Sequence, residues 1–168
     1  MVEIRKATAY DAEKILKYCK LIGGESDNLT FGSEGVSITV EQEEAYLEKI
    51  RNSDKQLYLI AVNNGEIVGA GIFSAYTKPR LAHRGEISIS VKKAMWGNHI
   101  GTRFMEEIIR FAKYTAKIEI ISLEVRSDNE RAIALYKKFG FETVGTFEGY
   151  MKINGEDIDC DIMHLYLK

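Results

Sequence analysis

The sequence predicts an α+β fold with a mixed, mostly antiparallel sheet of seven strands and four helices. Hydrophobic periodicity gives the order strand, two helices, three strands, helix, strand, helix, two strands. Asn-Gly pairs at residues 64–65 and 154–155 are typical of tight turns between antiparallel strands. Strand–helix–strand crossovers in the second half make the sheet mixed.

The chain begins with a strand, predicted from Val2 to Lys6, and a first helix follows it. Thr8 and Asp11 have the spacing of an approximate capping box, which satisfies two free backbone N–H groups. Gly23-Gly24 marks the expected end of this helix. Apolar residues at helical spacing predict its buried stripe, namely Ala12, Ile15, Leu16, Cys19 and Ile22.

A polar segment punctuated by glycine, from Glu25 to Ser37, is predicted to be a loop. Thr39 and Gln42 form a second capping box at the start of the second helix. The inner face of that helix is predicted from its apolar residues, which are Tyr46, Leu47 and Ile50.

Strand-like alternation replaces the helical period from residue 56 onward. We expect strands from Leu57 to Val62 and from Ile67 to Tyr76, and a further strand from Glu86 to Val91. Alternation divides this last strand between two faces, with Ile87, Ile89 and Val91 on one and Glu86, Ser88 and Ser90 on the other.

The second half alternates helices with strands. After a long helix, a strand is expected from Ile118 to Arg126, followed by a short helix from Asn129 to Phe139 that ends at Gly140. From Phe141 onward the pattern is that of an antiparallel pair. The apolar side of the long helix consists of Ile100, Phe104, Ile108 and Phe111.

Composition and charge exclude several classes of protein. The 168 residues carry 23 Lys and Arg against 25 Asp and Glu, and this net charge of −2 argues against a dedicated nucleic-acid binder. No apolar run approaches the ~18 residues of a membrane span, and the first residues lack the apolar core of a secretory signal. The length predicts one domain over residues 1–168. Two cysteines are too few for a disulfide framework, so we expect the cytoplasm, and the short apolar runs predict no membrane partner.

Histidine and cysteine positions give little support to metal or thiol chemistry. His83, His99 and His164 show no metal-ligand spacing, so we expect no metal. Cys160 could in principle accept an acyl group, but the sequence places no His or Asn partner beside it.

The segment before the long helix combines glycine with a helix N-terminus. It consists of Trp96, Gly97, Asn98, His99, Ile100 and Gly101. Glycine at such a turn lets backbone N–H groups point at one spot, and the helix N-terminus adds about half a positive charge, which favours a bound anion. The segment lacks the fingerprints of nucleoside triphosphate and dinucleotide loops. A tight turn whose glycines serve only packing is the alternative.

The span from Val91 to Gly101 resembles the coenzyme A loop of GNAT-superfamily acyltransferases, whose pattern is Gln/Arg-x-x-Gly-x-Gly/Ala. Trp96 takes the Gln/Arg place, His99 the first Gly and Gly101 the second, so two of the three positions depart from the pattern.

The later part of the chain resembles the same family more closely. Residues 125–141 carry Val-Arg-x-x-Asn, Ala-Ile, Leu-Tyr and Phe-Gly-Phe at the family's spacing. The preceding Leu-Glu-Val-Arg at 123–126 is particularly similar to the ribosomal-protein N-terminal acetyltransferase branch.

The resemblance implies a three-layer α/β/α fold and acetyl-CoA as the co-substrate. In the family, a strand end binds the pantetheine amides as an added strand would, which assigns Ile89, Ser90 and Val91 here. Asn129 would contact the coenzyme A arm. The loop would hold the pyrophosphate through Trp96, Gly97, Asn98, His99, Ile100, Gly101 and Thr102.

Acetyl transfer from a thioester to an amine needs a base for the ammonium and an acid near the leaving thiolate. The resemblance indicates Tyr136 as the acid, and Asn129 lies seven residues earlier on the same helical face. Two carboxylates compete for the base. Glu124 matches the acid proposed in the ribosomal-protein branch, whereas Glu86 lies one residue from where other branches place theirs. Ordered water alone is a third alternative.

We therefore expect direct transfer of acetyl from acetyl-CoA to a primary amine within a ternary complex. The amine belongs to a small molecule or a protein N-terminus, and a homodimer is compatible with the family. The alternative function is a non-catalytic acyl-CoA-binding regulatory module, which the departures at Trp96 and His99 favour. Acidic residues of the last hairpin would attract a cationic amine or form only a solvated face; they are Glu148, Glu156, Asp157, Asp159 and Asp161.

Overall fold

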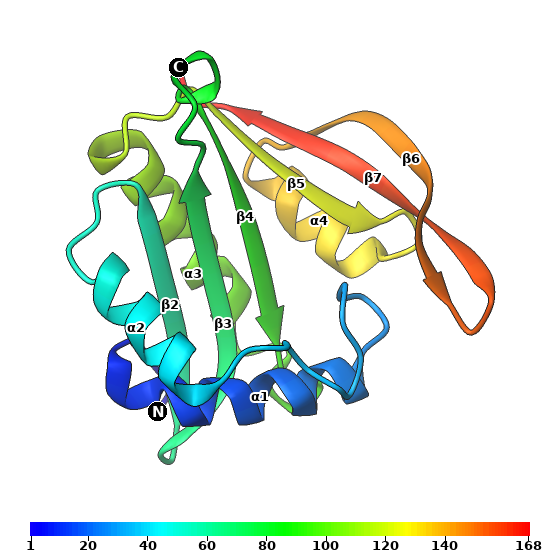
Figure 1. Cartoon of the computed structure of the whole chain (residues 1–168). Coiled ribbons are helices and arrows are strands. Elements are labelled where there is room, and N and C mark those ends of the chain that lie inside the picture. Colours follow the sequence, from blue (N-terminus) through cyan, green and yellow to red (C-terminus); the bar gives the residue numbers. More distant parts are fainter.

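The computed structural model describes all residues from 1 to 168, as one sheet between two pairs of helices (Figure 1). The strands are β1 (Glu3–Lys6), β2 (Gln56–Asn63), β3 (Glu66–Ala75), β4 (Arg84–Val91), β5 (Ile120–Arg126), β6 (Glu142–Ile153) and β7 (Glu156–Tyr166). The helices are α1 (Ala12–Glu25), α2 (Val40–Ile50), α3 (Ile100–Arg110) and α4 (Glu130–Lys138). The strand order is β1-β2-β3-β4-β5-β7-β6, and only β4 and β5 pair in parallel. The predicted seven-stranded mixed sheet with four helices is confirmed.

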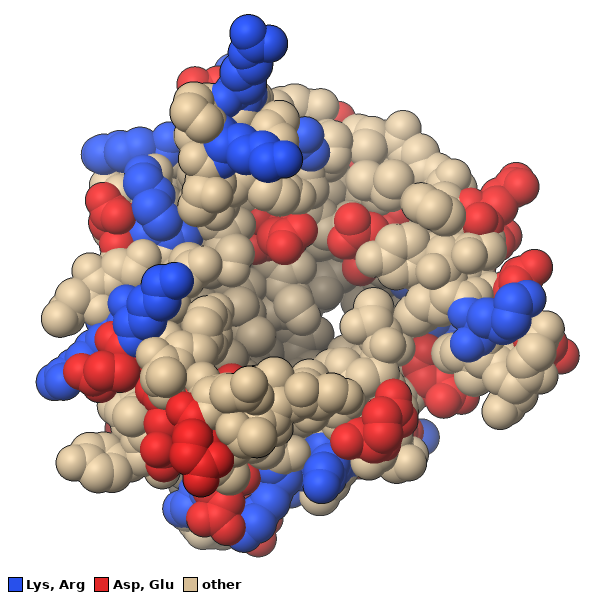
Figure 2. All heavy atoms as spheres, in the orientation of Figure 1, with Lys and Arg blue, Asp and Glu red and all other residues tan.

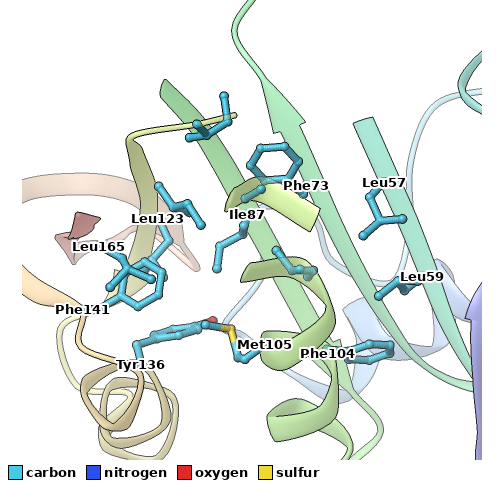
Figure 3. Packing of buried hydrophobic residues seen from close by; sticks show 14 of the residues in the cluster. Leu57, Leu59, Phe73, Ile87, Phe104, Met105, Leu123, Tyr136, Phe141 and Leu165 are labelled. Atoms are coloured by element: carbon cyan, nitrogen blue, oxygen red, sulfur yellow. The ribbon is translucent and has the colours of Figure 1, made fainter. Parts of the chain in front are cut away.

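The two pairs of helices cover opposite faces of the sheet. On the α1 and α2 face, Ile15 and Leu47 pack with Ile60 of β2. On the α3 and α4 face, Phe104 and Leu123 belong to a larger core, part of which Figure 3 shows. No helix is both long enough and apolar enough to cross a membrane.

The predicted division of β4 between two faces is confirmed. Ile87 is buried in the core on the α3 side, and Ile89 and Val91 pack against it. On the opposite face, the hydroxyl of Ser90 lies 2.9 Å from the hydroxyl of Tyr18 on α1. The odd-numbered side chains of β4 therefore face α3, whereas the even-numbered ones face α1.

β4 and β5 diverge along their length, and this divergence positions the site. Only residues 84–86 of β4 pair with β5, opposite residues 120–122. Beyond that point β4 continues beside β3 alone, and β5 continues beside β7 alone. Figure 1 shows the two halves of the sheet spreading apart, with the loop after α1 close to the opening.

The predicted end of the first helix was wrong. α1 runs through Gly23 and Gly24 to Glu25 instead of stopping at the glycine pair. A Cβ on Gly23 would overlap the backbone carbonyl of Gly32, so this glycine allows the loop after α1 to lie directly against the helix. The pair thus serves a close contact and not a helix end, and sequence alone does not separate these two uses.

Smaller boundary differences follow from tertiary contacts. Residues 9–11 form a 3-10 turn ahead of α1, in which a carboxylate oxygen of Asp11 accepts the N–H of Thr8 at 2.8 Å. Tyr18 is buried on α1, whereas Leu16 of the predicted stripe is only half-buried. β5 begins at Ile120, two residues later than predicted, and α4 begins at Glu130.

Gly23→Ala is expected to lower the free energy of unfolding by about 2 kcal/mol, because the new methyl group would overlap the backbone carbonyl of Gly32. Urea denaturation measures this change. Gly24→Ala is the matched control, since its Cβ would lie 3.3 Å from the Cβ of Ser33 and alanine favours a helix by about 0.5–1 kcal/mol over glycine. Equal destabilisation by both substitutions would contradict the assigned contact.

Candidate active site

The divergence of β4 from β5 opens a cavity of about 900 Å³. Its walls come from β4, β5, the residues that follow α1, the loop before α3, α4 and β6. Figure 2 shows the hollow at the centre of this face of the molecule. Because the cavity lies between two separated strands, side chains from both faces of the sheet reach it.

The free edge of β4 presents backbone groups to this cavity. The other edge of β4 pairs with β3. At the two ends of that pairing, the Lys92 N–H donates to the carbonyl of Val68, and the Tyr76 N–H donates to the carbonyl of Arg84. Even-numbered residues of β4 therefore bond to β3, and the backbone groups of Ile89 and Val91 point toward the opening. Ser90 lines the cavity, but its own backbone groups face β3.

The loop before α3 forms one end of the cavity. His99 has φ of 57°, a left-handed conformation that favours glycine, and it takes the first Gly position of the loop pattern that the sequence resembles; Gly97 has φ of 83°. The His99 side chain does not cap α3, which leaves the N–H groups of the first helical turn free for a ligand. Asn98 does not line the cavity; its side-chain amide donates to the carbonyl of Met95 at 3.0 Å and holds the turn.

Trp96 connects this loop with β4 and with α4. Its indole N–H donates to the carbonyl of Val91 at 3.1 Å. The guanidinium carbon of Arg131, from the first turn of α4, lies 4.5 Å from the centre of its ring, and the Lys93 ammonium lies 5.9 Å from it. Lys93, Arg131 and His99 all line this end of the cavity, and the lysine and the arginine give it two positive charges.

Asn129 and Tyr136, which the spacing predicted on one helical face, both line the cavity from α4. Asn129 is the N-cap residue of α4, and its side-chain oxygen accepts the N–H of Ala132 at 3.2 Å. Tyr136 extends toward Met105 of α3, and its ring centroid lies 5.8 Å from that of Phe141 (Figure 3). Burial raises the pKa of Tyr136 to about 12.

Glu86 and Glu124 lie on the same face of the sheet and both line the cavity. Glu86 is paired in register with Ser122, two residues before Glu124, and β4 has no bulge, so no slip turns Glu86 away. Burial, followed by the negative charge of Glu86, raises the pKa of the Glu124 carboxyl. The hydroxyl of Tyr76 donates to Glu86 at 3.1 Å.

Several residues that the sequence reasoning missed also shape the cavity. The end beside Trp96 is lined by Arg131. The end away from Trp96 is lined by Arg126, Asp27 and Tyr150. Arg126 was recognisable as part of the Leu-Glu-Val-Arg segment, but its contacts with residues 27 and 128 depend on the tertiary structure. Tyr150 comes from the irregular part of β6, where pairing with β7 is interrupted between Phe147 and Met151, and no sequence pattern announces it.

Cys160 also lines the cavity, and it is buried. Burial is the main reason that the pKa of its thiol is raised. A raised pKa leaves less of the nucleophilic thiolate at neutral pH. No three side chains of the types that bind metals are grouped together anywhere in the structure.

Comparison with known proteins gives a family match over residues 28–141, to the model described as the acetyltransferase (GNAT) family. The L-amino acid N-acetyltransferase AaaT of Escherichia coli (strain K12) is 32% identical over 62% of this chain and 65% of its own length. The N-alpha-acetyltransferase RimI of Mycobacterium tuberculosis is 36% identical over 60% of this chain and 61% of its own. Each match thus spans less than two thirds of the relative.

Solved structures match over nearly the whole chain. A GNAT-family acetyltransferase from Streptococcus pneumoniae has a TM-score of 0.94 and 30% identity, with 99% of each chain covered. The yncA structure from Salmonella typhimurium, solved with its cofactor acetyl-CoA, has a TM-score of 0.84 and 18% identity over 99% of this chain and 94% of that one. At that identity the second likeness concerns the fold alone.

Proposed function

Because this chain belongs to the acetyltransferase (GNAT) family, we propose that it is an N-acetyltransferase that uses acetyl-CoA and a primary amine. The observation that carries the proposal is the divergence of β4 from β5, which surrounds one cavity with a free strand edge, an uncapped helix N-terminus, a tyrosine and two carboxylates. The S. pneumoniae relative supports the same fold and family for the whole length of the chain.

Residues of this chain fit a coenzyme A arm along the opening. The backbone groups of Ile89 and the N–H of Val91 suit the amides of an extended pantetheine, because unpaired strand edges bind extended ligands through main-chain hydrogen bonds, whereas the Val91 carbonyl already accepts the Trp96 indole N–H. The N–H groups at the start of α3 suit a diphosphate, which the helix dipole stabilises. The presence of acetyl-CoA in the Salmonella structure of the same fold supports this donor, which supplies an activated acetyl thioester.

The carboxylates and Tyr136 would serve the two ends of the reaction. Glu124 accepts a proton from the ammonium, directly or through one water, so that the neutral nitrogen can bond to the acetyl carbon as the carbon–sulfur bond breaks. The nitrogen loses its second proton afterwards, and the products are an amide, a free thiol and one proton. Tyr136 donates a hydrogen bond toward the departing sulfur.

Direct attack by the amine is favoured over transfer through a cysteine. Cys160 is the cysteine in the cavity wall, and burial raises the pKa of its thiol. No histidine lines the cavity near Cys160 to act as its base, since the lining histidine is His99 in the loop before α3.

Calorimetric titration with acetyl-CoA, with ATP as the control, tests the donor site. We expect micromolar binding of acetyl-CoA and much weaker binding of ATP. Because Trp96 is the single tryptophan and lies in the loop, binding should also change the tryptophan fluorescence. No binding at millimolar acetyl-CoA would contradict the proposal. Binding without thiol release from any of a broad panel of amines would favour a non-catalytic acyl-CoA-binding module.

Thr102→Glu is expected to weaken acetyl-CoA binding by at least about tenfold while the protein stays folded. Thr102 is in the first turn of α3 and lines the cavity. A carboxylate there interacts favourably with the helix dipole but repels a diphosphate from the same N–H groups. Thermal unfolding and calorimetry together measure the two effects, and Thr102→Gln is the neutral control of similar size. Unchanged affinity in Thr102→Glu would place the diphosphate elsewhere.

A further inference from the structure

The cavity is divided electrostatically between its two ends. Lys93 and Arg131 line the end beside Trp96, where the donor phosphates are proposed to bind. Glu25 also lines the cavity there, and its carboxylate accepts the backbone N–H of Lys93 at 3.1 Å, so two cations face one carboxylate at this end. The other end, built from β4, β5 and the residues after α1, carries the carboxylates of Asp27, Glu86 and Glu124. Acidic atoms are visible at the upper wall of the hollow in Figure 2.

Arg126 is the one cationic side chain lining the acidic end, and three of its five N–H donors are already engaged. Its Nε donates to one carboxylate oxygen of Asp128 at 2.9 Å, and one Nη donates to the other oxygen at 2.8 Å. The second Nη donates to the backbone carbonyl of Asp27 at 3.2 Å. This two-point ion pair holds the guanidinium against Asp128, so another carboxylate would have to compete with Asp128 for it.

Arg84 is also on the same face of β4 but does not line the cavity. Its guanidinium lies over the Tyr76 ring, 5.6 Å from the centroid, and donates to the Ser122 hydroxyl at 3.4 Å. By contrast, neither Glu86 nor Glu124 has an ion-pair partner within the protein. The acidic end thus offers three unpaired carboxylates to a cation, whereas its one cation, Arg126, is already paired with Asp128.

We propose that the acceptor is a primary ammonium with no carboxylate beside it, and that free α-amino acids are poor substrates. The proposal rests on the proposed acetyl transfer and names the acceptor class of that site. A free amino acid carries its carboxylate on the carbon next to the ammonium. Placing the ammonium against Glu124 therefore brings a third negative charge beside Glu86 and Glu124, with no arginine to receive it.

Two sources share the chemistry of the proposed acceptor. The α-amine of a peptide has a neutral amide where a free amino acid has its carboxylate, and a diamine has a second ammonium. Either one satisfies the acidic end. The E. coli relative is an L-amino acid N-acetyltransferase. The proposal is that this chain uses a different class of acceptor, because Arg126 is paired with Asp128.

The first experiment compares kcat/KM for L-alaninol and L-alanine, measured as thiol release from acetyl-CoA by the full chain. The two amines have similar basicity and differ in whether a neutral hydroxymethyl group or a carboxylate sits beside the nitrogen. We expect alaninol to exceed alanine by at least about 100-fold. An amidated peptide that begins with alanine, and putrescine, are the two arms that distinguish a peptide from a diamine as the source.

The second experiment releases Arg126 by substituting its partner. Asp128→Asn removes the charge that holds the guanidinium, and we expect the alaninol-to-alanine ratio to fall by at least about tenfold. Glu107→Gln is the matched control, because it also removes an exposed carboxylate paired with an arginine, Arg110, at 2.8 Å on the surface of α3. The control should keep the ratio of the unmodified protein.

Three results would overturn the proposal. Alanine used as well as alaninol would overturn the acceptor class and leave acetyl transfer intact. An unchanged ratio in Asp128→Asn would show that the engaged Arg126 is not what excludes the carboxylate. Thiol release with none of the four amines, despite acetyl-CoA binding, would overturn the proposed function together with the acceptor class.

Discussion

Tyr136→Phe is expected to lower kcat for acetyl transfer by about 100- to 1000-fold and to leave acetyl-CoA affinity nearly unchanged. The substitution removes only the hydroxyl of a residue that lines the cavity wall. The ring and its contact with Phe141 remain, so the free energy of unfolding should change little. Steady-state kinetics with calorimetry separate the two effects.

The raised pKa defines what Tyr136 can contribute. At a pKa of about 12, the phenol stays protonated throughout a normal assay range, and it is a weaker acid than a thiol at about 8.5. It therefore stabilises the departing sulfur by a hydrogen bond, and solvent supplies or takes the proton. We expect no loss of activity from ionisation of Tyr136 below pH 10.

Tyr58→Phe is the matched control for this prediction. Tyr58 is a buried tyrosine of β2 that does not line the cavity. Its substitution removes the same atom elsewhere in the fold and should leave kcat unchanged. Equal losses of kcat and of acetyl-CoA affinity in Tyr136→Phe would instead make Tyr136 a binding or packing residue.

Glu124→Gln is expected to lower kcat/KM by about 100-fold, and Glu86→Gln by clearly less. Glutamine keeps the size of the side chain but cannot accept the proton of the ammonium. The Glu124 carboxyl opens on the cavity and has its pKa raised, as a base working near neutral pH requires. A larger loss in Glu86→Gln would assign the base to Glu86, and small losses in both would assign it to ordered water.

The pH dependence gives a second readout for the same pair. A base must be ionised to act, so kcat/KM falls as pH drops through the raised pKa of Glu124, above the ordinary value of about 4.3. Glu86→Gln removes the like charge that contributes to this shift. The acidic limb should therefore move to lower pH in Glu86→Gln, and movement to higher pH would contradict the coupling of the two carboxylates.

Local patterns were sufficient for most of the fold and for part of the site. The alternation along β4 correctly divided Ile87, Ile89 and Val91 from Glu86, Ser88 and Ser90, because side chains of a strand alternate whatever its partners are. The seven-residue spacing of Asn129 and Tyr136 predicted that they share one helical face, and both line the cavity. The roles of these residues in binding and catalysis stay predictions until the variants are measured.

Where sequence reasoning was wrong, the cause was a specific contact that hydrophobic periodicity does not record. Gly23 looked like a helix end, but it accommodates the loop at Gly32, nine residues away. Asn98 has the position of a cavity residue in the loop, yet its side chain turns back to the Met95 carbonyl. Neither contact leaves a periodic trace in the sequence.

By itself, the sequence determined the types and order of the elements, the faces of the strands and the family, since these depend on side-chain periodicity and short motifs. Only the tertiary structure decided that β4 and β5 separate after three paired residues, that Trp96 bonds to Val91 and stacks on Arg131, and that Arg126 is engaged by Asp128 and Asp27. The shape and charge of the cavity depend on where distant segments meet in space. Periodicity describes each segment alone, so it carries no record of those meetings.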